Sequence, residues 1–80
     1  MTPDMRRAKL KRLCEIEGYD DAEKLFLAVI SDSVSPAICC NAEKPACDFT
    51  AEMEPDQEQG WCEACGRGTM VSALVLGAII

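Results

Sequence analysis

Six cysteines in a chain of 80 residues constrain this sequence more than any other feature. A chain of this length forms one small domain with a thin stability margin, so it commonly depends on disulfides, a metal ion or a partner subunit. Five of the cysteines lie in the segment 38–68, and the sixth, Cys14, lies near the N-terminus. This clustering predicts either a disulfide framework or a metal site.

The start of the sequence favours the metal site. The stretch MTPDMRRAKLKRLCEIEGYD has basic residues but neither the apolar run nor the cleavage site of a signal peptide. We therefore expect a cytoplasmic protein, whose thiols stay reduced, and a secreted disulfide framework is the less favoured alternative. The most apolar run, residues 70–80, is much shorter than the roughly 20 residues that a membrane-spanning helix needs, so we expect no membrane association.

The cysteine spacing predicts the ligands of one structural zinc ion. Cys62 and Cys65 form a Cys-x-x-Cys pair, and fourteen residues separate them from Cys47. The fourth ligand is Cys39, with Cys40 as the alternative, because the gaps of seven and six residues to Cys47 both exceed the usual two to four. Four thiolates surround zinc tetrahedrally at about 2.3 Å and leave no position for a catalytic water. We expect Cys14 to be a small buried apolar residue.

The sequence contains no histidine, which removes the commonest general base and the usual catalytic triads. We therefore expect no enzyme and assign no catalytic residue. The run WCEAC, residues 61–65, superficially resembles a thioredoxin active site. That chemistry needs the first cysteine at a helix N-terminus in a βαβ unit. Because GRG follows the pair and no βαβ pattern precedes it, a redox protein is a distant alternative.

Residues 1–31 predict a helical hairpin. Thr2 is a suitable cap for the first helix and Gly18 a suitable stop, and Asp20 is the predicted cap of the second helix. Apolar residues at 22, 25, 26 and 29 form one helical face. A DNA-binding helix-turn-helix is disfavoured, because the second helix carries three acids and one lysine.

The rest of the chain predicts a strand and an apolar tail. Residues 47–53 alternate between apolar and polar side chains, which predicts a half-buried strand that returns as a β-hairpin to Trp61. We expect Phe49, Met53 and Trp61 to join the helices in one core. Residues 69–80 favour a helix capped by Thr69, although their β-branched residues also suit a strand. This tail is a candidate surface for self-association.

The net charge is −6 and is unevenly distributed. Residues 1–12 carry five basic side chains and one acid, and the remainder carries three basic residues and thirteen acids. An acidic body argues against broad nucleic-acid binding. The basic residues are expected to form a solvated helix face or to pair with acids of the same fold: Arg6, Arg7, Lys9, Lys11 and Arg12. The acids Glu52, Glu54, Asp56 and Glu58 are expected to be solvated.

The run CDFTAEMEPDQEQGWCEACG, with SDSVSPAIC before it and VSALVLGAII after it, resembles a family of small, mostly uncharacterised bacterial and phage-associated proteins. Their pattern is Ile-Cys, a short loop, Cys-Asp-Tyr/Phe-Thr, Glu-Pro-Asp-Gln, Gly-Trp-Cys-Glu-x-Cys-Gly and an apolar tail. The resemblance covers residues 31–80 and implies a zinc-ribbon-like domain without an established activity. It places Cys39 at the first cysteine, but the following loop is longer here and contains Cys40, so both candidates stay open.

These observations predict a single α+β domain over residues 1–80. It comprises a helical hairpin (1–31), a four-cysteine zinc-ribbon-like β-hairpin (38–68) and an apolar C-terminal helix (69–80). The predicted function is that of a zinc-stabilised module that binds a protein partner. A zinc-ribbon accessory protein that associates with nucleic acid in transcription or replication is the alternative.

Overall fold

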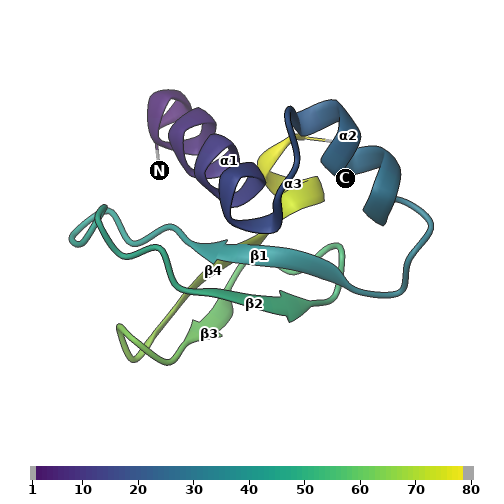
Figure 1. Ribbon diagram of the computed structural model, residues 1–80. Coiled ribbons are helices and arrows are strands. Elements are labelled where there is room, and N and C mark those ends of the chain that lie inside the picture. The colour runs from purple at the N-terminus through teal and green to yellow at the C-terminus, as the bar shows by residue number, and fades with distance from the viewer. Residues whose placement is uncertain (1, 79–80) are drawn as a thin grey trace.

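A computed structural model describes residues 2–78 and shows an α+β fold, as predicted. Helices α1 and α2 lie on one side of a four-stranded antiparallel sheet (Figure 1). In chain order the elements are α1 (Pro3–Glu17), α2 (Ala22–Val29), β1 (Ser35–Cys39), β2 (Thr50–Met53), β3 (Gly60–Cys62), β4 (Arg67–Ser72) and α3 (Ala73–Leu76).

The helix boundaries follow from capping side chains. The Thr2 hydroxyl accepts a hydrogen bond from the Met5 N–H at 3.1 Å, and Gly18 ends α1 with a left-handed φ of 84°. The second helix starts one residue later than predicted. Asp21 is its cap and accepts from the Lys24 N–H at 2.9 Å, whereas Asp20 pairs with the Lys24 ammonium group.

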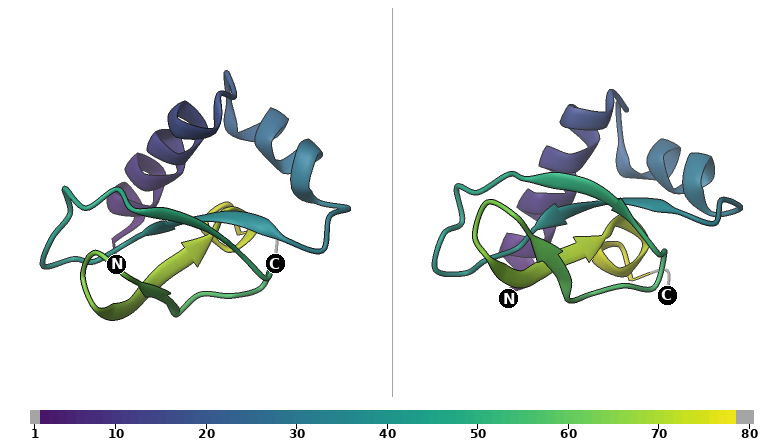
Figure 2. Two further views of the ribbon diagram at one scale, coloured as in Figure 1. Left: turned by 60° about the horizontal axis from the view of Figure 1, so that its bottom comes forward. Right: turned by 90° about the horizontal axis from the view of Figure 1, so that it is seen from below.

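The sheet has the order β2-β1-β4-β3, which corrects the predicted hairpin between residues 47–53 and Trp61. Strand β2 pairs with β1, β3 pairs with β4, and β2 and β3 are therefore the two edge strands. The connection 54–59 runs from one edge of the sheet to the other (Figure 2). It is held to the end of β4, because the Gln57 carbonyl accepts from the Ser72 N–H and the Pro55 carbonyl accepts from the Ser72 hydroxyl.

Two separate cores lie on the two faces of the sheet. The helix-side core packs α1, α2 and α3 on Ile38 and Val71. The second core contains Ala37, Met70 and four of the cysteines, with Phe49 and Met53 packed against it. The prediction of a single core that Phe49 and Met53 share with the helices is therefore wrong. Trp61 belongs to neither core and is 61% exposed, so its predicted burial is also wrong.

The C-terminal segment is only partly helical. Residues up to Ser72 belong to β4, and Ser72, rather than Thr69, caps the short helix α3 by accepting from the Val75 N–H. The four residues of α3 are buried in the helix-side core of their own chain, so this stretch offers no free surface for self-association. The predicted helix also included Ile79 and Ile80, which lie outside the described residues.

No helix among residues 2–78 is long and apolar enough to cross a membrane.

Candidate metal centre

Two loops at one end of the sheet bring four cysteines together (Figures 1 and 2). Cys39 ends β1, and Cys47 precedes β2 after a loop of two successive turns. Cys62 ends β3, and Cys65 lies in the turn that leads into β4. Each pair therefore spans the connection between two hydrogen-bonded antiparallel strands, which is the arrangement expected of a zinc ribbon.

Strand periodicity separates Cys39 from Cys40. Successive side chains of a strand point to opposite faces. Cys39 therefore lies in the second core beside Cys62, whereas Cys40 lies in the helix-side core. The Cys40 thiol donates to the Ile38 carbonyl at 3.5 Å, and burial raises the pKa of Cys40 to about 11. Of the two candidates that the sequence left open, only Cys39 reaches the cluster.

A tight turn orients the Cys-x-x-Cys pair. The Gly66 N–H donates to the Cys62 carbonyl at 2.7 Å, and Gly66 has a left-handed φ of 66°, which favours glycine. The Cys65 N–H lies 3.4 Å from the Cys62 sulfur and donates to it. The turn thus directs both thiols and one backbone N–H towards the same point.

The spacing of the sulfur atoms fits a tetrahedral metal ion. The four Sγ atoms of Cys39, Cys47, Cys62 and Cys65 all lie within 4.8 Å of one another. The Cys39–Cys65 distance is 3.7 Å and the Cys47–Cys62 distance is 3.9 Å. Four thiolates at about 2.3 Å from a central zinc ion lie roughly 3.8 Å apart at the edges of their tetrahedron. The two measured distances are opposite edges of such a tetrahedron, so the residues present fit the ion.

The clustered cysteines are not joined by disulfides in this structure. A disulfide needs its sulfur atoms about 2.05 Å apart. All six cysteines lie within residues 2–78, and all are free thiols. The Cys-x-x-Cys pair also lies between two strands and not at a helix N-terminus, so it lacks the dipole that activates a redox thiol. The geometry therefore favours metal binding over the redox alternative.

Hydrogen bonds favour the thiolate form of Cys47 and only partly offset the effect of burial at Cys39. A backbone hydrogen bond from Phe49 lowers the pKa of Cys47 to about 7. Burial raises the pKa of Cys39 to about 12, although hydrogen bonds from the Thr69 hydroxyl and the Asn41 backbone oppose this rise. The positive charge of a bound ion favours deprotonation of every coordinating thiol. Because burial raises the pKa of Cys39, its thiolate form would depend on the charge of a bound ion.

Helix α1 holds the Cys47 loop through a buried lysine that the sequence reasoning missed. Lys9 is only 4% exposed, and its ammonium group donates to the Cys47 carbonyl at 2.6 Å and to Asp48 at 3.2 Å. The Arg12 guanidinium donates to the same carboxylate at 2.9 Å and, together with Lys9, keeps the pKa of Asp48 below its usual value. Two cations of the basic segment therefore stabilise the loop that carries a candidate ligand.

Of the remaining basic residues of α1, one contacts another helix and two are exposed to solvent. Arg6 donates to the Val75 carbonyl of α3 at 2.6 Å. Arg7 pairs only with Asp4 of its own helix and is largely exposed, and Lys11 is exposed as well. The prediction of a solvated helix face therefore holds for Arg7 and Lys11, and its alternative, pairing with acids of the same fold, holds for Lys9 and Arg12, which both contact Asp48.

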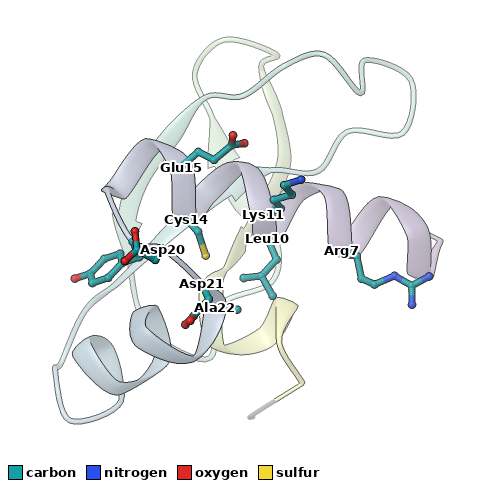
Figure 3. Close-up of a pocket in the computed structure, with 9 residues that line it drawn as sticks. Arg7, Leu10, Lys11, Cys14, Glu15, Asp20, Asp21 and Ala22 are labelled. Carbon is teal, nitrogen blue, oxygen red and sulfur yellow. The ribbon is translucent and has the colours of Figure 1, made fainter.

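A separate pocket lies between α1 and α2 and contains none of the four clustered cysteines. Its volume is about 390 Å³. Leu10 and Cys14 point from α1 towards the start of α2, where Asp21 and Ala22 lie (Figure 3). Burial raises the pKa of the Cys14 thiol, and the nearby Asp21 carboxylate raises it further. Cys14 is therefore a small buried residue of the helix-side core, as predicted.

No family model matches this chain, and no curated protein or solved structure is significantly similar to it.

Proposed function

We propose that this chain is a small zinc-binding protein whose metal has a structural role and whose surface binds a protein partner. The observation that carries the zinc is the set of four sulfur atoms at tetrahedral spacing. Tetrahedral sites made of four thiolates hold zinc or iron, and zinc is the usual ion where no redox role is required. Cys39, Cys47, Cys62 and Cys65 would hold the ion.

A structural role follows from the donor set. Four cysteines fill the coordination sphere of zinc and leave no position for a substrate or a catalytic water. The site also joins the β1–β2 and β3–β4 loops, which no other cysteine links. Metal binding in such small domains contributes about 10–16 kcal/mol, so the ion would decide whether the second core forms. We place the protein in the cytoplasm, where its six thiols would stay reduced.

A metal site that is fully coordinated by cysteines does not bind a substrate, so we propose that this small protein acts by binding a partner. The charge of its surface indicates which class of partner it binds. The segment 41–69, which carries the metal loops, has seven acidic and two basic residues. Such a surface repels phosphate groups, so a protein partner is favoured over nucleic acid. A zinc-ribbon nucleic-acid accessory protein is the competing proposal, and it requires binding in spite of this charge.

Removal of the metal tests the structural role. Addition of a strong zinc chelator to the purified protein is expected to abolish the near-ultraviolet circular dichroism of the folded state and to broaden the NMR signals of the second core. Readdition of zinc should restore the circular dichroism and the NMR signals, because the positive ion offsets the repulsion among the four thiolates. A protein that retains its fold at full chelation would contradict a structural role. In a parallel experiment, binding of single-stranded oligonucleotides to the immobilised protein at low salt would favour the proposal of a nucleic-acid accessory protein.

A further inference from the structure

Trp61 lies at the surface, next in sequence to one of the clustered cysteines. Its neighbours in β3, Gly60 and Cys62, are both buried, and Cys62 is one of the four clustered cysteines. Gly60 packs against the flexible end of the Met53 side chain, and a Cβ at this position would lie 3.0 Å from the Met70 Cβ. Because side chains alternate along a strand, Trp61 points away from the face that holds Cys62. The only tryptophan of the chain therefore lies between two buried residues and is itself 61% exposed.

Of the three residues of β3, only Trp61 is exposed to a partner. β3 is an edge strand that pairs only with β4 in the described sheet. An edge strand has backbone N–H and C=O groups that can pair with an additional extended segment. An exposed tryptophan on such an edge is the kind of residue that dominates the binding energy of an interface.

The charges around Trp61 are acidic and lack a free local cation. Glu63 is two residues away and Glu58 is three, so their α-carbons lie within roughly 7 Å and 11 Å of that of Trp61. Both are exposed. The nearby cation, Arg67, pairs with Glu43 at 2.8 Å. Trp61 therefore lies in a negative environment that favours a cationic partner and disfavours a phosphate chain.

We infer that Trp61, Glu58 and Glu63 form a docking surface for an extended, arginine-bearing segment of a protein partner. An arginine guanidinium stacks on the indole ring, and the acids bind its neighbouring cations. The backbone of the segment can pair with β3 only at Trp61, because Gly60 and Cys62 are buried. This inference rests on the proposed interaction role and specifies the surface and the chemistry of the partner.

The emission of Trp61 provides a direct test, since the protein has no other tryptophan. Zinc-loaded, full-length protein is titrated with a capped hexapeptide of alternating arginine and valine. The expected result is a saturable change of the Trp61 emission that weakens as salt is raised. The lysine–valine peptide should bind more weakly, because an ammonium group stacks less well than a guanidinium. The glutamate–valine peptide should not bind.

Variants assign the binding to this surface. Glu63→Gln should weaken arginine-peptide binding about threefold, as for an exposed ion pair. Trp61→Leu, measured by calorimetry, should weaken it about tenfold or more. Glu52→Gln is the matched control, because Glu52 is an exposed acid on the opposite edge strand, β2. It should change the affinity less than twofold.

Three results would overturn the inference: no saturable binding of the arginine peptide, equal loss in Glu52→Gln and Glu63→Gln, or a change of Trp61 emission with oligouridine but not with the peptide. Metal analysis of the same samples separates this inference from the proposed function. If the protein contains zinc but does not bind the peptide, only the docking surface is wrong. If the protein contains no zinc and is folded, the proposed structural role of the metal is wrong, whatever the result with the peptide.

Discussion

Replacing Cys39 with serine is expected to weaken zinc binding by about a hundredfold or more and to disorder the second core. A structural zinc site contributes about 10–16 kcal/mol through four thiolates, so the loss of one thiolate removes roughly 3 kcal/mol. A serine hydroxyl stays protonated at neutral pH and is therefore a poor substitute for a thiolate ligand. Competition with a chromophoric chelator measures the affinity, and circular dichroism follows the fold. Cys47→Ser, Cys62→Ser and Cys65→Ser should behave in the same way.

Cys40→Ser is the matched control, because it changes the neighbouring cysteine on the opposite face of β1. A serine at position 40 can still donate to the Ile38 carbonyl, which the Cys40 thiol contacts now. This variant should retain one zinc ion with an affinity within a few-fold of the parent protein and lose only a modest amount of stability. If Cys40→Ser abolished zinc binding and Cys39→Ser did not, the assignment of the fourth ligand would be wrong.

The second large effect is expected at Lys9. Lys9→Met should lower the free energy of unfolding by about 2–3 kcal/mol, because it leaves the Cys47 carbonyl without its buried donor and removes one cation from Asp48. It should also weaken zinc binding about tenfold, as is typical when a group that orients a metal ligand is lost. Denaturant unfolding of the zinc-loaded protein and chelator competition measure the two effects.

Lys11→Met supplies the control for Lys9→Met, since Lys11 is an exposed lysine on the same helix. Its effect on stability should stay within about 0.5 kcal/mol. A double-mutant cycle with Asp48→Asn should show coupling to Lys9 but none to Lys11, because only Lys9 contacts that carboxylate. Equal effects of Lys9→Met and Lys11→Met would show that the contact of Lys9 with the Cys47 loop has no special role.

The cysteine cluster could be predicted because metal sites impose spacing on the sequence. The Cys62–Cys65 pair and its distance from Cys47 indicated the site, but spacing alone could not choose between Cys39 and Cys40. That choice depends on which face of β1 each side chain occupies. Because β1 was not recognised as a strand, its periodicity could not be applied.

The two central strands were missed for a physical reason. All five residues of β1 are buried, so the strand lacks the alternation that identifies a half-exposed strand. Ser35 and Pro36 also resemble turn residues. Pro36 is tolerated because it lies beyond the last residue of β1 that pairs with β4, where no N–H donor is required. Without β1 and β4, the sequence left β2 and β3 as apparent hairpin partners.

Burial of a charged side chain and exposure of an aromatic one both contradict simple hydropathy. The sequence gives no local sign that Lys9 finds a carbonyl and a carboxylate 38 and 39 residues away. Similarly, Trp61 lies between the buried residues Gly60 and Cys62, so the alternation of side chains along β3 leaves the indole exposed. Both features arise from tertiary contacts, and both lie next to the candidate metal centre.

Native mass spectrometry of the protein purified without chelator tests the central claim most directly. The account predicts a folded chain whose mass exceeds that of the apoprotein by one zinc ion, less the protons lost from its thiols. The mass difference also distinguishes zinc from iron. A folded, compact chain at the metal-free mass would contradict the account.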